Sequence, residues 1–179
     1  MKIHIGCGSR DFGKDWVHID GGDFEHVQYN DITDLSQFEP NSVDLIYASH
    51  VLEYFDRKEV MYVLDNWYSV LKVGGILRLA VPDFEAMAKL YVAGSHSLTA
   101  FLGPLYGKME MNDQTIYHKT TYDFQSIKNI LFGRKFTTVR YWNWRETEHS
   151  HIDDCSQAYL PHMEKSKGVL ISLNVEAIK

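Results

Sequence analysis

The fold is decided by Ile3-His4-Ile5-Gly6-Cys7-Gly8-Ser9, a short apolar run that ends in a glycine-rich turn. A second short run, Val17 to Ile19, follows and ends in Asp20. Both patterns are typical of buried strands that lead into turns. Glycine after a first strand lets the backbone approach a ligand with no Cβ in the way, and open α/β sheets bind ligands at the carboxyl ends of their strands. The N-terminal residues therefore predict a ligand site formed by strand ends.

The rest of the chain alternates strand-like and helix-like segments. We expect further strands at 27–30, 44–48 and 76–81, and two last strands at 136–142 and 169–175 that pair antiparallel. Apolar residues at helical spacing predict helices over 60–71 and 84–92, and another that starts near Asp123 and ends before Gly133. Residues 72–75, Lys-Val-Gly-Gly, are expected to end the first helix with a left-handed glycine. This order predicts a mostly parallel sheet covered on both faces.

Length, charge and cysteine content limit the classes of protein. The 179 residues suffice for one domain over 1–179, without a separate substrate domain. The net charge of -6 argues against nucleic acid as a partner, because neutralising phosphates needs clustered Lys and Arg. Cys7 and Cys155, the two cysteines, suit a reducing compartment, and no stretch approaches the length of a membrane span. We expect a cytoplasmic protein without a membrane partner.

Two acidic residues follow strand-like runs close to the glycine turn. Asp20 ends the second strand, where a carboxylate can accept both hydroxyls of a ribose, and Asp31 follows the expected third strand. Together with the glycine turn they form one nucleoside-shaped site at three successive strand ends. Each acid taken singly has a structural alternative, because Asp is also a common helix cap and turn former.

The glycine turn and four later segments resemble the successive motifs of class I S-adenosylmethionine (SAM)-dependent methyltransferases. The later segments are Asp15-Trp16-Val17-His18-Ile19-Asp20, Asn41-Ser42-Val43-Asp44-Leu45-Ile46-Tyr47-Ala48-Ser49-His50-Val51-Leu52-Glu53-Tyr54, Val70-Leu71-Lys72-Val73-Gly74-Gly75 and Val81-Pro82-Asp83. Small predicted methyltransferases with a GCG turn and a Val-Pro-Asp motif, several encoded beside surface-polysaccharide genes, are similar over residues 1–92 and more loosely over 117–140. The resemblance implies a Rossmann-like sheet with an antiparallel last strand and without the usual N-terminal helix, 1–92 being the cofactor-binding half and 93–179 the substrate-facing half.

The resemblance also implies a set of cofactor-binding residues. The backbone of Gly6, Cys7 and Gly8 would wrap the methionine part of SAM, Asp20 would take the ribose, Asp31 with Ile32 would border the adenine, and Ser49 and His50 would line the cleft beside the sulfonium; Ser9 and Gly21 complete the set. Two residues depart from the family pattern. His4 stands where an acidic residue usually lies, and Arg10 where a third glycine usually lies, so a backbone carbonyl or water is expected to take the amino group of SAM.

Methyl transfer from a sulfonium is an in-line displacement that requires positioning and, for a hydroxyl acceptor, removal of a proton. Imidazole is the obvious base near neutral pH. We expect His118 to act first and His151 next, with His50 as a further candidate and Tyr117 and Tyr122 able to orient His118. A merely structural hydrogen bond is the alternative role for His118. The pair His149-x-His151 resembles a metal site, but we expect no metal.

The expected function is methyl transfer from SAM, leaving S-adenosylhomocysteine (SAH), to a small molecule such as a sugar or another polysaccharide-related hydroxyl. Two irregular stretches, 94–120 and 146–167, are expected to set the specificity for the acceptor. A non-catalytic SAM-binding accessory protein is one alternative. An NAD-dependent oxidoreductase is disfavoured, because residues 6–10 lack the GxGxxG spacing. We also expect a homodimer, because the missing first helix leaves one sheet face under-covered.

Overall fold

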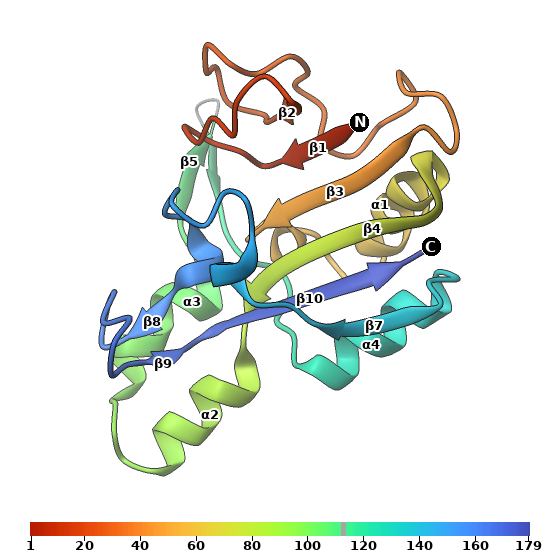
Figure 1. Ribbon diagram of the computed structural model, residues 1–179. Coiled ribbons are helices and arrows are strands. Elements are labelled where there is room, and N and C mark those ends of the chain that lie inside the picture. The colour runs from red at the N-terminus through yellow and green to blue at the C-terminus, as the bar shows by residue number, and fades with distance from the viewer. Residues whose placement is uncertain (112–113) are drawn as a thin grey trace.

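The computed structural model, which describes residues 1–111 and 114–179, is built around a six-stranded sheet (Figure 1). The strand order is β2-β1-β3-β4-β10-β7. The strands are β1 (Lys2–Ile5), β2 (Trp16–Ile19), β3 (Val43–Ser49), β4 (Leu71–Pro82), β7 (Thr138–Tyr141) and β10 (Ser172–Ile178). The first four run parallel, and β10 runs antiparallel to both of its neighbours. The predicted α/β sheet with an antiparallel last strand is confirmed.

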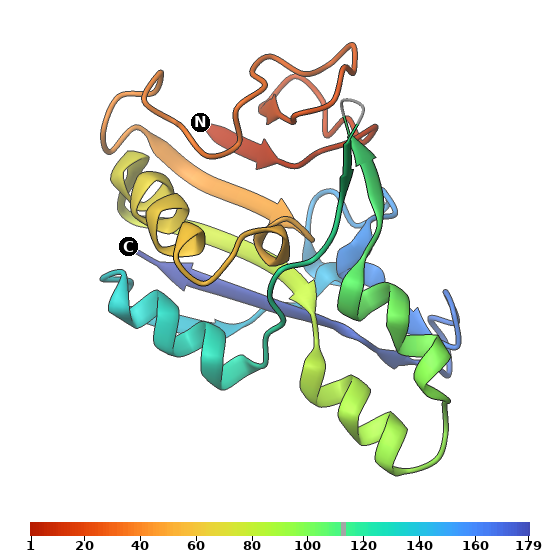
Figure 2. The same ribbon diagram turned by 180° about the vertical axis from the view of Figure 1, so that it is seen from behind.

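Helices α1 (Glu59–Val70) and α4 (Phe124–Gly133) lie on one face of the sheet (Figure 2). The apolar residues of α1 are spaced three or four apart and are buried against the sheet, as the sequence pattern predicts. Helix α4 starts at Asp123, whose carboxylate accepts the N–H of Ser126, while the Ser126 hydroxyl pairs with the N–H of Asp123. This reciprocal cap fixes the start of α4 where the sequence places it.

Loops and rings cover the opposite face of the sheet. Alternate strand residues point to this side, and the ring of Phe12 stacks on His4 and His149 with centroid distances of 3.9 and 4.2 Å. The aromatic–histidine cluster defined here consists of His4, Phe12, Trp16, His18, Tyr47 and His149. The predicted cover on both faces is present, but on this side it consists of rings from the N-terminal half and from the 140s. The expected homodimer loses its argument from an under-covered face and stays a prediction.

The remaining elements gather near the carboxyl ends of β1, β3 and β4 (Figure 1). They are η1 (Leu52–Tyr54), α2 (Phe84–Val92), η2 (Leu98–Phe101), α3 (Leu102–Tyr106), the hairpin of β5 (Met109–Met111) and β6 (Gln114–Ile116), η3 (Trp144–Glu146), η4 (Cys155–Gln157), and the pair β8 (Tyr159–Leu160) and β9 (Val169–Leu170). Helix α2 confirms the prediction over 84–92. No helix among the described residues is long and apolar enough to cross a membrane.

The expected third strand at 27–30 is wrong. This segment makes a single parallel bridge, between Ile19 and Tyr29, and continues no ladder. The physical reason is a side chain that replaces a backbone partner, because Gln28 Oε1 accepts the N–H of His18 at 2.5 Å. The side chain of Asn30 likewise bonds to the Asp20 carbonyl. Two backbone bonds, from the N–H of Gln28 to His18 and from the N–H of Asp20 to Tyr29, also hold the segment along β2 without making it a strand.

The expected glycine cap on the helix over 60–71 is also wrong. Helix α1 ends at Val70, and Leu71 already pairs with Val43 in the sheet. Gly74 does have a left-handed φ of +79°, but it lies within β4, where the pairing register with β3 shifts. Its N–H donates to the carbonyl of Lys179. The helix ends before the glycine because Leu71 is buried in the sheet. Gly74 instead allows the irregular backbone at the start of β4.

The last two strands pair antiparallel as predicted, although their bounds differ. Strand β7 is shorter than the expected 136–142, and the segment 169–175 is divided between β9 and β10. Val175 lies opposite Tyr141, and Ile178 opposite Thr138. Ile171 separates β9 from β10 because its N–H bonds to Ala158 and its carbonyl accepts from Asp83, away from the sheet.

We predict that acid weakens the fold through the aromatic–histidine cluster. Burial lowers the pKa of His149 to about 4 and that of His4 well below its usual range, whereas both rings titrate near the ordinary value of about 6.5 in the unfolded chain. Between these pKa values the unfolded chain binds more protons. The free energy of unfolding therefore has its full value above about pH 6.5. Below that pH it decreases as the pH falls, by at most about 1.4 kcal/mol per pH unit for each histidine.

Thermal melting between pH 8 and pH 5 tests this expectation. His149→Phe keeps the stacked ring and removes the titrating group, so its melting temperature should fall less steeply with acid than that of the wild type. His151→Phe is the matched control, because His151 is exposed. Equal slopes for the wild type and His149→Phe would contradict the prediction.

Candidate active site

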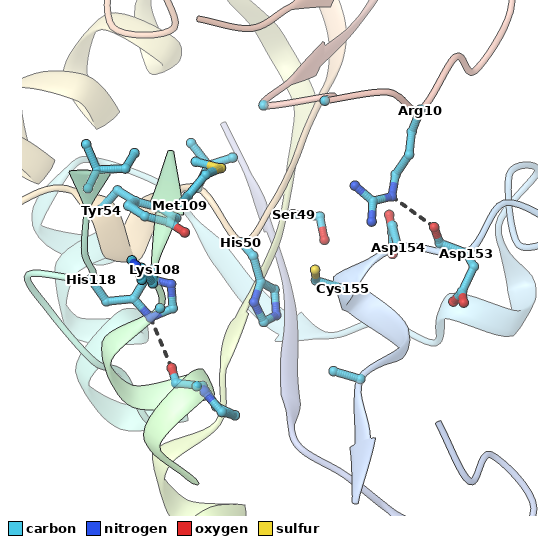
Figure 3. A pocket seen from close by; sticks show the side chains of 18 of the residues that line it. Arg10, Ser49, His50, Tyr54, Lys108, Met109, His118, Asp153, Asp154 and Cys155 are labelled. Carbon is cyan, nitrogen blue, oxygen red and sulfur yellow. Dashed lines mark hydrogen bonds between the residues drawn. The ribbon is translucent and has the colours of Figure 1, made fainter. Parts of the chain in front are cut away.

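A pocket of about 1470 Å³ lies at the carboxyl ends of the parallel strands (Figure 3). Gly6 and Gly8 follow β1, Asp20 follows β2, and Ser49 and His50 lie at the end of β3. Pockets for a single small ligand usually measure about 300 to 1,000 Å³. The volume is therefore sufficient for a nucleoside cofactor together with a second small molecule.

The glycine turn forms one wall of the pocket through its backbone. Gly6 has a φ of +66°, and a Cβ at this position would lie 2.2 Å from Cγ2 of Val51. The N–H of Gly6 donates to the carbonyl of Ile19, and the N–H of Gly8 donates to Oδ2 of Asp20 at 2.7 Å. The side chain of Cys7 is buried outside the pocket lining, and burial raises the pKa of its thiol to about 12. Only glycine fits at position 6.

Asp20 connects two backbone turns and still faces the pocket. Its Oδ2 accepts from Gly8 and its Oδ1 from the N–H of Gly22, each at 2.7 Å, and the residue is 8% exposed. Gly21 and Phe24 line the pocket beside it. A carboxylate oxygen can accept more than one hydrogen bond, so each oxygen retains capacity for a ligand hydroxyl.

Asp31 and Ile32 have different surroundings although they are adjacent. Ile32 lines the pocket, and its carbonyl accepts from Nε1 of Trp67. Asp31 does not line it, because its Oδ1 accepts the N–H and the hydroxyl of Thr33 at 2.8 and 2.7 Å. These bonds hold the pKa of Asp31 below its usual range. Asp31 therefore has the turn-forming role that was its structural alternative, and Ser9 is exposed outside the pocket.

His50 lines the pocket in an unusual backbone conformation. Its φ is +55°, and its N–H donates to the carbonyl of Ala80. The ring lies between two polar partners, with Nε2 3.3 Å from Oγ of Ser172 and Nδ1 3.3 Å from Oε1 of Glu53. Burial, with a smaller contribution from His118, lowers the pKa of His50 to about 3. The ring is neutral at physiological pH.

His118 lines the same pocket and also makes a structural hydrogen bond. Its Nδ1 lies 3.0 Å from the carbonyl oxygen of Pro104, and its Nε2 lies 3.8 Å from Oε1 of Glu53. The edge of the ring packs on Tyr54. Burial lowers its pKa. Because a carbonyl only accepts, Nδ1 carries the hydrogen, and Nε2 is the nitrogen that can take up a proton.

The structure does not bring the other proposed catalytic residues to the pocket wall. Tyr117 is 51% exposed, and Tyr122 is buried with its hydroxyl 3.4 Å from the carbonyl of Leu52. His151 is exposed in a loop whose next turn presents Asp153 instead. His149 belongs to the buried cluster, whereas His151 is exposed. No group of three or more metal-ligating side chains occurs among residues 1–111 and 114–179.

Several pocket residues were not expected from the sequence. Figure 3 shows Tyr54 and Lys108 beside the expected His118 on one side, with Arg10, Asp153 and Asp154 on the other. Nε of Arg10 donates to the carbonyl of Asp153 at 2.9 Å. Arg10 had one signal, its place where the family has a third glycine. Tyr54 lies at the end of the segment 41–54, and Lys108, Asp153 and Asp154 come from the irregular stretches 94–120 and 146–167, whose contacts depend on tertiary folding.

A family model described as a methyltransferase domain matches residues 13–79. A SAM-dependent methyltransferase from Archaeoglobus fulgidus is similar in structure, with a TM-score of 0.61 and 16% identity over 99% of this chain and 85% of that chain. Residues 13–79 therefore match a methyltransferase family, and the chain as a whole has the fold of SAM-dependent methyltransferases. Both findings point to methyl transfer with SAM as the methyl donor.

Two further solved structures are similar to this chain in fold. One is a SAM-dependent methyltransferase from Mesorhizobium loti, with a TM-score of 0.56 and 14% identity over 99% of this chain and 90% of that chain. The other is 1,6-didemethyltoxoflavin-N1-methyltransferase from Burkholderia thailandensis with bound SAH, with a TM-score of 0.57 and 11% identity over 99% of this chain and 70% of that chain. No curated protein matches by sequence.

We predict that Gly6→Ala damages the site far more than another glycine substitution. The added Cβ would overlap Val51, and the alanine would also have to adopt a left-handed φ. We therefore expect a loss of about 2 to 4 kcal/mol in the free energy of unfolding. Gly13→Ala is the matched control, because Gly13 has a φ of +89° with no atom within 4 Å of the added Cβ. Its expected loss is about 1 to 2 kcal/mol. Equal losses in denaturant unfolding would show that the contact with Val51 has no effect.

Proposed function

We propose that this chain transfers the methyl group of SAM to a small-molecule acceptor within the 1470 Å³ pocket. The observation that carries the proposal is the convergence of the glycine turn, Asp20 and two neutral histidines on one pocket. We also propose that residues 1–92 hold the cofactor and 93–179 face the acceptor. When bound, SAM supplies a methyl group activated by a positively charged sulfonium.

The cofactor contacts follow from the groups in the wall of the pocket. The backbone of Gly6 to Gly8 would hold the methionine part of SAM, Asp20 would accept the ribose hydroxyls, and Ile32 would pack on the adenine. Arg10 would bind the carboxylate of the methionine part, because its guanidinium lies beside Gly8, 3.7 Å from where a Cβ would lie. His4 takes no part in this account, because it is buried in the aromatic–histidine cluster.

We propose that the acceptor is a polar molecule that presents a hydroxyl, such as a sugar. Both acidic and basic side chains line the acceptor half of the pocket, among them Lys108, Glu110, Asp153 and His162. Such a wall offers both donors and acceptors, which suits the hydroxyls of an uncharged polyol. A sugar or another polysaccharide-related hydroxyl rests on the family resemblance in addition to this lining.

His118 is the proposed base for a hydroxyl acceptor. Its Nε2 edge faces the backbone of Gly107, which also lines the pocket, so close that a Cβ there would lie 2.5 Å away. Removal of a hydroxyl proton by a positioned imidazole contributes about 100-fold to 10,000-fold in rate. Tyr54 packs against the ring and replaces Tyr117 and Tyr122 as the phenol beside His118.

Each alternative function requires a structural feature that differs from those of the proposed methyltransferase. In an NAD-dependent oxidoreductase a helix follows the glycine turn and directs its N-terminus at the pyrophosphate, whereas residues 9–15 here form no helix. A non-catalytic SAM-binding protein needs no proton acceptor beside the cofactor. The two pocket histidines with depressed pKa values therefore favour catalysis.

Substitution of Asp20 tests the cofactor site. Asp20→Ala removes two charged hydrogen bonds to the ribose, each worth about 1.5 to 3 kcal/mol, so SAH affinity should fall on the order of a hundredfold or more. Calorimetry with SAH measures it, and circular dichroism checks folding, because Asp20 also holds Gly8 and Gly22.

Asp31→Ala is the matched control, since Asp31 is an exposed acid bonded only within its own turn. Its SAH affinity should stay within about twofold of the wild type, because no ligand bond is lost. Unchanged affinity in a folded Asp20→Ala protein would remove Asp20 from the site. A large loss in Asp31→Ala would restore Asp31 as a ligand.

A further inference from the structure

Glu53 is a buried carboxyl group directly behind the proposed active site. It lies in η1, is fully buried, and neither of its oxygens has a hydrogen-bond partner among the described residues. The backbone carbonyl of Glu53 accepts the N–H groups of Lys119 and Thr120, which fixes the element in place. An isolated buried carboxylate is strongly unfavourable, so the position requires nearby groups that change its charge or share its proton.

Two pocket histidines face this carboxyl group. Oε1 of Glu53 lies 3.3 Å from Nδ1 of His50 and 3.8 Å from Nε2 of His118. Glu53 itself is not part of the pocket lining, whereas both histidines are. Burial raises the pKa values of Tyr54, Tyr122 and Cys155, and the charge of Glu53 adds a smaller contribution to each. No Lys or Arg of residues 1–111 and 114–179 forms a salt bridge with Glu53.

The partners on the far side of each ring decide where its hydrogen lies. Nδ1 of His118 donates to the carbonyl of Pro104, which leaves the lone pair on Nε2, 3.8 Å from Oε1 of Glu53. The hydroxyl of Ser172 donates to Oδ1 of Asn174 and so accepts from Nε2 of His50. The lone pair of Nδ1 in His50 therefore also faces Glu53.

Three acceptors thus converge on one point, and a single proton relieves their mutual repulsion. Burial raises the pKa of Glu53 to about 8 and lowers the pKa values of both histidines. The shared proton therefore rests mainly on Glu53 at neutral pH. Because the groups interact strongly, the network titrates as a unit rather than as separate residues.

We propose that Glu53 is a positioning residue that shares one proton with His50 and His118 and stores the proton released by the acceptor during methylation. The proposal rests on the proposed function. As the acceptor oxygen bonds to the methyl carbon, the bond from that carbon to sulfur breaks and leaves SAH. The hydroxyl proton moves to Nε2 of His118 and then to the carboxylate of Glu53. The proton leaves to water before the next cycle, so the unprotonated network is the active form.

Histidine ring NMR between pH 6 and pH 10 tests the shared proton without any ligand. In the wild type, the ring nitrogens of His50 and His118 should shift with a common midpoint near pH 8, where the network loses its proton. Glu53→Gln should abolish this transition, because its amide cannot titrate. Glu59→Gln, which changes a glutamate paired with Lys119 at the surface, should keep it. If Glu53→Gln fails to fold, the common wild-type midpoint alone decides.

A wild type without a transition between about pH 7 and pH 9, or one unchanged in Glu53→Gln, would overturn the proposal. Glu53→Gln should also bind SAH within about twofold of the wild type and, with an identified acceptor, lose about 10-fold to 100-fold in kcat. Its kcat should no longer rise through pH 8. Failure to bind SAH in the wild type would contradict the proposed function and leave the NMR result standing, so the two failures are distinguishable.

Discussion

The carboxylate of Asp20 holds the cofactor side of the molecule together. It accepts the N–H groups of Gly8 and Gly22, each at 2.7 Å, and so connects the turn after β1 to the turn after β2. The same turn depends on Gly6, whose missing side chain lets Val51 approach. Val51 leads directly into η1 and Glu53, so the cofactor wall and the proton-sharing group are fixed by one set of short contacts.

The face of the sheet opposite the helices contributes to the site as well as to the fold. The hydroxyl of Tyr47, within the aromatic–histidine cluster, donates to Asp154 at 2.5 Å. Asp154 also accepts the N–H and the hydroxyl of Ser156. These bonds hold the segment that forms the pocket wall opposite His118. Packing of neutral rings on the sheet thereby determines where that wall lies, which connects the stability of the cluster to the shape of the pocket.

Periodic patterns predicted the strands, the helices and the glycine turn, because burial of one face leaves a regular trace in the sequence. The prediction of a third strand was wrong because the side chain of Gln28 accepts the backbone N–H of His18. A pattern of apolar residues does not indicate such a bond. Asp31 and His151 do not line the pocket although their loops reach it through Ile32 and Asp153, because which side chain of a loop faces a cavity depends on local bonds such as those of Asp31 to Thr33. Glu53 had one signal, a charged residue within the apolar run 51–54, but its meaning depends on His118, which is 65 residues away.

The central claim is that the glycine turn, Asp20 and the pocket histidines form one site around SAM. A crystal structure of the SAH complex tests it most directly. The account predicts the ribose on Asp20 and the thioether sulfur within about 10 Å of the rings of His50 and His118, close enough for a base to reach an acceptor that lies about 3 Å from the methyl carbon. SAH bound away from Asp20, or a sulfur farther than about 10 Å from both rings, would contradict the account.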